Sequence, residues 1–374
     1  NPCGLHRPVT SMRELAGRAF SVEEVVKALV TCFAATFGYA AAETQMGAFT
    51  RGASGDYDVD TRVAAGAFSA QERSEHVPVS RGRLTGEPER PPWMKVTANL
   101  GDGYRQLKGL MDDLQLNTVC QEAACPNIYE CWGAGTATLM LLGDVCTRAC
   151  SFCDVATGRP GDVDPLEPFR AAAAVEKMGL EHAVLTSVNR DDLEDGGASI
   201  FAAAIREIRR RLPDCAVEVL IPDFKGDWEA LQTVMDAGPD VLNHNTETVL
   251  RLQRDVRTAA SYGRSLALLA RAKAIHPGGT VKSGLIVGMG ESDDEVHGAL
   301  SDLAAVGVDI VTIGQYLRPS PRHRPITRYV HPDTFREYAE VGRSRGIPHV
   351  EAGPLVRSSY HAREATLSAG RTRS

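Results

Sequence analysis

The clearest clue to the fold is TLMLLGDVCTRACSFC, residues 138–153. Its first part, TLMLLGD, is an apolar run typical of a short buried strand. Three cysteines follow at once, at Cys146, Cys150 and Cys153. A structural zinc site closes its tetrahedron with four protein ligands, and disulfides use cysteines in pairs. Three thiols therefore indicate a metal centre with one corner left open, where a small molecule can bind.

This strand is the first of a series that alternates with helices along the chain. Apolar runs typical of strands recur at 182–188, 216–222, 240–245, 281–288 and 309–315. Stretches typical of helices lie between them, at 167–180, 197–212, 227–238, 261–275 and 292–307. Parallel strands appear as continuous apolar runs because crossover helices cover the sheet. The pattern predicts an α/β fold, a partial (β/α)6-type TIM-like barrel.

Polar residues gather directly after the strands. These clusters are NRDD (189–192), PDFKGD (222–227), HNTET (244–248), GMGESDD (288–294) and RPSPRHR (318–324). The active site of such a barrel lies at the carboxyl ends of its strands, so these loops and the three cysteines are predicted to share one site. GMGESDD lacks the third glycine of a dinucleotide-binding loop, which argues against a Rossmann fold.

Composition excludes several classes of protein. The chain has 374 residues, is 43% hydrophobic and 24% charged, and carries a net charge of -7, so no general affinity for nucleic acid is expected. It has no apolar run of about 18 residues, so no membrane span is expected. Six of the nine cysteines fall between Cys120 and Cys153, which favours metal binding over disulfides in a chain of this size.

Residues 1–90 differ from the rest. FSVEEVVKALVTCFAATFG (20–38) predicts one amphipathic helix, and the polar tract after it is rich in glycine and serine, as linkers and disordered segments are. The segment has nine arginines and one lysine, a bias found in transit peptides, but also eleven acidic residues, which transit peptides avoid. We therefore interpret it as an extension that serves targeting or is disordered.

The spacing of the first triplet, C-x3-C-x2-C after a barrel strand, is similar to the signature of the radical S-adenosylmethionine (SAM) superfamily. The resemblance implies that Cys146, Cys150 and Cys153 hold a [4Fe–4S] cluster whose fourth iron chelates the amino and carboxylate groups of SAM. It also implies that an electron from the cluster splits SAM into methionine and a 5′-deoxyadenosyl radical. Ala149 and Ser151 depart from the residues common in the family, but neither position is a ligand.

A second cysteine triplet narrows the resemblance. CQEAACPNIYEC places Cys120, Cys125 and Cys131 in a C-x4-C-x5-C pattern, and RSSYHA (357–362) stands near the end of the chain. With LTSVNRDDLEDGGA, LNHNTETV, GLIVGMGE and IGQYLRPS, these motifs resemble the lipoyl synthase family over residues 92–365. The two triplets together with RSSY are specific to that family, whereas any one of them alone indicates only the superfamily.

Membership of that family implies the insertion of two sulfur atoms, at C6 and C8 of an octanoyl group on a lysine of a carrier protein, in the final step of lipoate biosynthesis. It assigns Cys120, Cys125 and Cys131 to an auxiliary [4Fe–4S] cluster that donates the sulfur. Ser358 is the implied fourth ligand and catalytic residue, with Ser359 as the alternative. The implied cofactors are two [4Fe–4S] clusters and SAM.

The same resemblance divides the chain into four parts. The extension 1–90 matches no motif of the family. An auxiliary-cluster segment, 91–136, forms a cysteine-rich extension in front of the barrel, 137–330. A C-terminal helix and the RSSY tail, 331–374, are expected to close the mouth of the barrel.

The implied contacts of SAM are Phe152, Thr186, Ser187, Asp191, Glu247 and Arg257. Phe152 stands where the superfamily keeps an aromatic residue, and the others follow predicted strands. Each has a plain structural alternative: loop packing for Phe152, helix capping for Asp191, and an ion pair on a solvated face for Glu247 with Arg257.

The implied partners are an octanoylated lipoyl carrier domain of a 2-oxoacid dehydrogenase, or the H protein of the glycine cleavage system, and an electron donor such as ferredoxin or flavodoxin. No nucleic acid or membrane is expected as a partner, and a monomer is expected. The amino-acid sequences of the motifs resemble those of bacterial and plastid members of the family. We therefore expect a plastid rather than a mitochondrion, with a bacterial-type cytoplasm as the alternative.

Two other functions stay open on the sequence alone. Another radical SAM sulfur-inserting or methylthiolating enzyme would share residues 146–153 but lack the second triplet together with RSSY. A non-catalytic iron–sulfur or zinc scaffold protein would need neither an open iron nor the polar loops after the strands.

Overall fold

The computed structural model describes residues 88–95, 136–360 and 362–368, together with positions 109, 111, 114, 116–118 and 127. The chain divides into two compact units, residues 1–79 and 80–374, and every described residue lies in the second. The helix predicted at 20–38 and the second cysteine triplet, Cys120, Cys125 and Cys131, lie outside the described residues. The boundary expected at residue 90 therefore stays a prediction.

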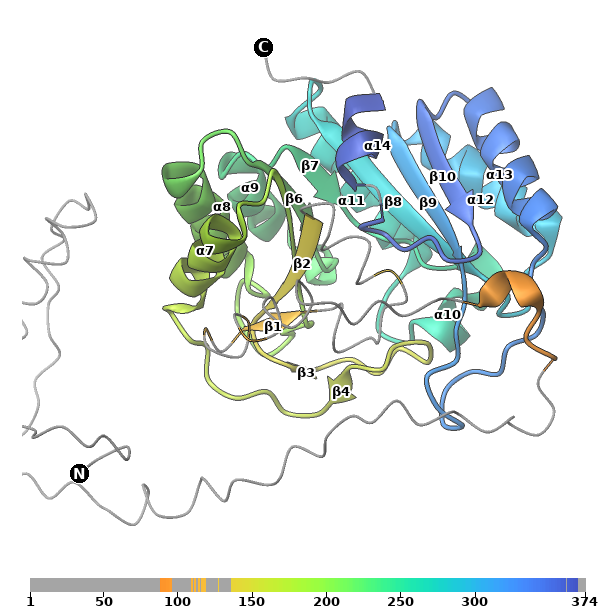
Figure 1. The fold of residues 1–374 in the computed structure, drawn as a ribbon, viewed down its shortest axis with the longest axis horizontal. Coiled ribbons are helices and arrows are strands. Elements are labelled where there is room, and N and C mark those ends of the chain that lie inside the picture. Colours follow the sequence, from red (N-terminus) through yellow and green to blue (C-terminus); the bar gives the residue numbers. More distant parts are fainter. Residues whose placement is uncertain are drawn as a thin grey trace, which may run out of the picture. The chain divides into compact units, whose positions relative to one another are not determined.

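An eight-stranded sheet forms the centre of the fold, in the order β1-β2-β5-β6-β7-β8-β9-β10 (Figure 1). Neighbouring strands are parallel except for β1, which runs antiparallel to β2. Among the described residues no pairing joins β10 back to β1, so the barrel is open and the expected partial barrel is confirmed. The strands are β1 (Asn117–Thr118), β2 (Thr136–Leu141), β5 (His182–Ser187), β6 (Ala216–Leu220), β7 (Val241–Asn243), β8 (Thr280–Val287), β9 (Ile310–Gln315) and β10 (His349–Gly353).

Helices cover the outer face of this sheet (Figure 1). The longer ones are α7 (Glu167–Met178), α8 (Ala198–Arg211), α9 (Trp228–Asp236), α11 (Tyr262–Ile275), α12 (Asp293–Ala305) and α13 (Pro332–Ser344). The shorter ones are η2 (Pro92–Met94), η3 (Phe224–Gly226), η4 (Leu250–Leu252), α10 (Gln253–Val256) and α14 (Ala362–Ser368). None of the helices in the described part of the chain is long and apolar enough to cross a bilayer.

Local sequence fixes where these helices begin and end. Ser292 precedes α12 and accepts a hydrogen bond from the Glu295 N–H (3.2 Å), while the Glu295 carboxylate accepts one from the Ser292 N–H (2.9 Å). This capping box satisfies two backbone donors that the helix cannot satisfy itself. At its C-terminus, α7 ends at Gly179, which has a φ of 60°, a left-handed conformation that glycine adopts without strain.

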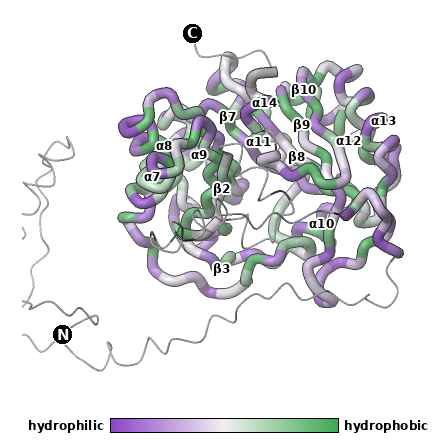
Figure 2. The backbone as a smooth tube through the Cα atoms, viewed as in Figure 1, coloured by the Kyte–Doolittle hydropathy of each residue, from purple (hydrophilic) through white to green (hydrophobic). Residues whose placement is uncertain are grey.

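Apolar side chains join the sheet to its helices. Alternate residues of the parallel strands, such as Leu185, Val219 and Leu242, are buried in one continuous core with Ile205 of α8 and Leu231 of α9. Figure 2 shows the outer helices α7 and α13 alternating between hydrophilic and hydrophobic residues. Each helix therefore turns one apolar side toward the sheet and leaves a polar side outside.

A group of charged residues lies on the inner face of the sheet. The Glu218 carboxylate on β6 accepts hydrogen bonds from Lys282 on β8 (3.1 Å) and from the Asn243 amide on β7 (2.9 Å), and His182 on β5 lies 3.4 Å away. Side chains of β6 and β8, which β7 separates, can meet only on a concave face. Burial alone would raise the pKa of Glu218, but the charges of Lys282 and His182 lower it to about 2.

One strand was not expected from the sequence. β10 pairs with β9 from His349 opposite Ile310 to Gly353 opposite Gly314, and it adds a seventh parallel strand beyond the six predicted. The strand lies at an edge, and only Val350 of its five residues is buried. A short strand of this kind lacks the continuous apolar run that marked the six central strands.

The variant Glu218→Gln should destabilise the fold, because Lys282 would keep its charge inside the barrel without a charged partner. Breaking a buried ion pair costs roughly 3–5 kcal/mol, and we expect a loss of that size in the free energy of unfolding by urea at pH 7. A carboxyl whose pKa falls from 4.5 to about 2 on folding stabilises the protein above pH 4.5. That contribution is lost as the pH falls toward 2, so the variant should respond less to acid over this range.

The control is Arg336→Ala, which removes an exposed ion pair with Asp333. It should change the free energy of unfolding by less than about 1 kcal/mol. Equal unfolding free energies for Glu218→Gln and the parent protein would contradict the buried ion pair.

Candidate active site at the mouth of the barrel

The loop that carries the first cysteine triplet leaves β2 and runs along the carboxyl ends of the strands. Cys146 lies in a short strand, β3 (Val145–Cys146), which pairs with β4 (Ala156–Thr157). The Thr147 N–H and hydroxyl both donate to the Asn189 carbonyl, at 3.0 and 2.9 Å, and the same hydroxyl accepts from the Asp191 N–H at 3.1 Å. The cysteine loop is thus tied to the loop after β5.

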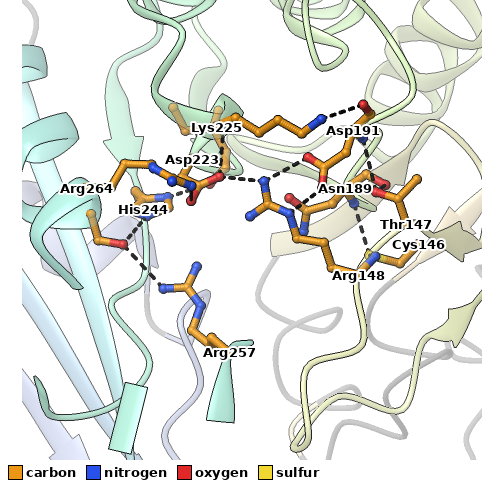
Figure 3. A network of polar contacts seen from close by, with 12 residues as sticks. Cys146, Thr147, Arg148, Asn189, Asp191, Asp223, Lys225, His244, Arg257 and Arg264 are labelled. Atoms are coloured by element: carbon orange, nitrogen blue, oxygen red, sulfur yellow. Dashed lines mark hydrogen bonds and ion pairs between the residues drawn. The ribbon is translucent and has the colours of Figure 1, made fainter. Parts of the chain in front are cut away.

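A buried arginine anchors the first half of the cysteine loop. Arg148, whose side chain is 4% exposed, donates to both Asp191 oxygens at 2.7 and 2.8 Å and also meets Asp223 at 2.7 Å (Figure 3). Arg264 of α11 meets the other Asp223 oxygen at 3.0 Å. Burial alone would raise the pKa of Asp223, but the hydrogen bond and charge of Arg148 lower it to about 2. Asp223 is therefore a fixed negative charge in the loop after β6, and it joins the cysteine loop after β2 to helix α11.

The three thiols suit iron better than they suit solvent. Cys146, Cys150 and Cys153 are half-buried and form no disulfide. Burial raises the pKa of Cys150 to about 11 and that of Cys153 to about 12, so these thiols need a bound cation to become thiolates. The N–H groups of Asn189 and Arg148 point at the Cys146 sulfur, at 3.3 and 3.4 Å. Hydrogen bonds of this kind tune the potential of a cluster bound by sulfur.

The arrangement does not suit a single metal ion. Within the described part of the chain, no three His, Cys, Asp or Glu side chains converge closely enough to share one ion, and this part includes Cys146, Cys150 and Cys153. Zinc needs such convergence because all of its ligands bind one atom. Thiolates on a four-iron cluster can lie further apart, because each binds a different iron. Three thiolates, each on a different iron, are the ligand set of a cluster that leaves its fourth iron open.

The candidates on β5 and in the loop after it have different surroundings. The Thr186 hydroxyl donates to the Leu220 carbonyl of the next strand at 2.9 Å, whereas the buried Ser187 hydroxyl oxygen has no partner among the described residues. Asp191 is engaged by Arg148, and Phe152 packs against the apolar core. All four lie at this end of the barrel, and their contact with SAM stays a prediction.

Glu247 and Arg257 both lie near enough to Cys150 to act on its thiol. Their charges act on the Cys150 thiol in opposite directions: Arg257 lowers its pKa and Glu247 raises it. Glu247 has a φ of 65°, a left-handed conformation that is uncommon without glycine and that marks functional sites. Burial raises the pKa of its carboxyl, although Arg257 opposes this. Arg257 is buried and donates to the Asn245 and Thr246 carbonyls at 2.9 and 3.3 Å, so it is not half of the exposed ion pair that we considered as the alternative.

Several residues of the site were not among the predicted contacts of SAM. Asn189 and Asn245 each bury a side-chain oxygen that has no partner among the described residues, as a site for a polar ligand requires. His244 bonds to the Ile221 carbonyl and the Ser265 hydroxyl, both at 2.9 Å, and burial lowers its pKa to about 4, so it is neutral (Figure 3). All lie in the polar clusters after strands, which was the available signal.

The C-terminal tail returns to the mouth of the barrel. A Cβ at Gly314, on the β9 strand, would lie 2.0 Å from the Val356 carbonyl oxygen, so glycine is required for the tail to lie there. Asn127, from between Cys125 and Cys131, donates to the Leu355 carbonyl at 2.7 Å. Asn127 therefore lies against the tail that carries Ser358, while the meeting of the second triplet with Ser358 stays a prediction because Cys120, Cys125 and Cys131 lie outside the described residues.

Comparisons with known proteins identify the family. Radical SAM superfamily proteins match residues 140–303, and the N-terminal domain of lipoyl synthase matches residues 63–125. A lipoyl synthase of Rubrobacter xylanophilus is 57% identical over 298 residues, which are 80% of this chain and 92% of that protein. The chain belongs to the lipoyl synthase family. Another lipoyl synthase, from Oceanobacillus iheyensis, is 53% identical over 285 residues, 76% of this chain and 91% of that protein.

Solved structures resemble this lipoyl synthase family member less closely. Methylornithine synthase is 14% identical with a TM-score of 0.46, over 72% of this chain and 83% of that one. Streptococcus suis SuiB bound to S-adenosylmethionine is 11% identical with a TM-score of 0.48, over 67% and 61%.

Membership settles the class of reaction. Lipoyl synthases are radical SAM enzymes that transfer sulfur and use SAM and [4Fe–4S] clusters, so the function expected from the motifs is confirmed and the scaffold alternative is not. The match of the N-terminal domain begins at residue 63, inside the extension that the motifs had left unmatched.

The variant Cys150→Ala should abolish formation of 5′-deoxyadenosine, because the cluster that binds SAM would lose one of its three thiolates. Cys215→Ala is the matched control: this buried thiol lies at the start of β6, away from the mouth, and SAM cleavage should persist. Chromatography of anaerobic reactions measures the product. Cleavage by Cys150→Ala at the parent rate would remove this triplet from the mechanism.

Proposed function

We propose that the chain inserts two sulfur atoms at C6 and C8 of an octanoyl group held as an amide on a lysine of a carrier protein. The cysteine loop carries this proposal: Cys146, Cys150 and Cys153 lie within eight residues of one loop, which Thr147 ties to the loop after β5. A cluster bound there keeps one iron for SAM. The activity of the family supports the same reaction.

The substrate explains why such a centre is needed. An octanoyl chain offers no acidic proton and no leaving group, so a hydrogen atom must be removed as a radical, which no side chain can do. SAM held beside the cysteine loop would supply that radical, once for each carbon. The residues of this chain orient SAM: Glu247 and Arg257 lie beside Cys150, and the unpartnered oxygens of Asn189 and Asn245 are available to its polar groups.

The second triplet would supply the sulfur. Cys120, Cys125 and Cys131 hold the auxiliary cluster in this proposal, and Ser358 is its fourth ligand. The hydrogen bond from Asn127 to the Leu355 carbonyl supports this pairing, because it joins the segment between Cys125 and Cys131 to the tail. A serine oxygen suits iron in a sulfide cluster less well than a thiolate does, which fits a cluster that is dismantled as it gives up sulfur.

The partners in this proposal follow from the chemistry. The compartment follows from the similarity of the motif sequences to those of bacterial and plastid members. The octanoyl-lysine belongs to a lipoyl carrier domain or an H protein, and a ferredoxin or flavodoxin supplies electrons. The chain acts as a monomer in a plastid, or in a bacterial-type cytoplasm.

Anaerobic turnover tests the proposal. The chain is incubated with an octanoyl-lysine peptide, SAM and a reductant, and the peptide is analysed by mass spectrometry. A lipoyl-lysine peptide with two 5′-deoxyadenosines per product supports the proposal, whereas SAM cleavage with a methylthiolated or unchanged peptide contradicts it.

The variant Cys125→Ala should cleave SAM but make no lipoyl product, because radical formation and sulfur supply depend on different triplets.

The variant Ser358→Ala should keep near-normal iron content and SAM cleavage but lose nearly all lipoyl product, because three thiolates still hold the auxiliary cluster. Ser359→Ala is the matched control and should make product at the parent rate. Ser358→Cys should also slow sulfur release, since thiolate holds iron more tightly. Full product from Ser358→Ala together with loss in Ser359→Ala would move the ligand to Ser359, and full product from both would remove the tail from the cluster.

A further inference from the structure

A histidine from a distant loop contacts the last cysteine of the first triplet. His323 lies between β9 and α13, and its Nε2 is 2.9 Å from the Cys153 carbonyl oxygen. A carbonyl can only accept, so Nε2 carries the proton and donates. Nδ1 then accepts from the Ser320 hydroxyl at 2.8 Å. The imidazole is thereby fixed in one tautomer and one orientation.

The backbone on both sides of this contact is held as well. The Arg324 N–H donates to the Ser151 carbonyl at 3.0 Å, and the Ser151 N–H donates to the Val256 carbonyl at the end of α10, also at 3.0 Å. Arg148 anchors the first half of the cysteine loop, and its hydrogen bonds and ion pairs within the described part of the chain do not reach residues 151–153. The second half therefore depends on the loop after β9 and on α10.

The loop that presents His323 is itself braced. The Tyr316 hydroxyl donates to the Arg324 carbonyl at 2.8 Å, and the Arg324 Nε donates to the Met289 carbonyl at 2.9 Å. Arg318 donates to the His323 carbonyl at 2.9 Å. These bonds tie the loop to the end of β9 and to the loop after β8, so the position of the His323 imidazole is fixed.

We infer that His323 is a positioning residue for Cys153, which holds the backbone of the third thiolate ligand in place. This inference rests on the proposed function, because it needs Cys153 to be a cluster ligand. Without the imidazole, a half-buried carbonyl beside the ligand loses its donor, and the turn at residues 151–153 loses one of its few restraints. Partners of this kind, one step removed from the metal, change affinity by about 10- to 100-fold.

The test compares His323→Ala, His323→Gln and Ser320→Ala after anaerobic reconstitution. Iron release to bathophenanthroline disulfonate is followed, together with the electron paramagnetic resonance spectrum of the reduced protein with SAM, which reports the cluster that binds SAM. His323→Ala should release iron about ten times faster and alter the spectrum. His323→Gln, whose amide can donate, should stay within about twofold of the parent, and Ser320→Ala should lie between them.

The matched control is His331→Ala, which removes an exposed histidine that caps α13 and meets the Trp93 ring edge to face. It should lower thermal stability and leave iron release unchanged. Parent-like iron release from His323→Ala, with loss of the cluster in Cys153→Ala, would overturn the role of His323 and leave the proposed function intact. A normal spectrum with SAM in Cys153→Ala would instead overturn the assignment of the triplet, and the inference with it.

Discussion

The buried guanidinium of Arg148 joins the loops on which the candidate site depends. Its partners Asp191 and Asp223 come from the loops after β5 and β6, and Arg264 of α11 completes the network. A charge taken out of water is costly unless it is paired in good geometry, so the loops have little freedom to rearrange while this pair is intact. The backbone of Cys146 and its neighbours is placed by that constraint, with the Arg148 and Asn189 N–H groups directed at the Cys146 sulfur.

Polar side chains fill the inner face of the sheet deep in the barrel, whereas glycines leave space nearer its mouth. Glu218, Lys282 and Asn243 fill the inner face with a polar cluster in which the Glu218 carboxylate accepts hydrogen bonds from both partners. Nearer the mouth, Gly284 and Gly314 take the places of larger residues, because a Cβ would collide with Asn245 at the first and with the Val356 carbonyl at the second. The site and the C-terminal tail therefore occupy room that glycine provides in the strands.

Much of this could be predicted from the sequence, for identifiable reasons. Six strands were found because buried parallel strands leave continuous apolar runs, and the open metal site was found because three cysteines follow the first of them. β10 was missed because an edge strand has a weaker pattern. Asp191 is among the predicted SAM contacts, and the structure adds that Arg148 binds it, which the sequence could not show because a carboxylate after a strand looks the same whichever partner it has. The contacts of Asp223 and His323 join residues far apart in the chain, which no local pattern reveals.

In the proposed mechanism two clusters have separate tasks, and among the described residues a hydrogen bond from Asn127 joins the segment of the second triplet to Leu355 of the tail. Iron and sulfide analysis of the anaerobically reconstituted protein tests this division most directly. Two [4Fe–4S] clusters predict about eight iron and eight sulfide per chain, and about four of each in Cys125→Ala. About four iron in the parent protein, or zinc in place of iron, would contradict the assignment.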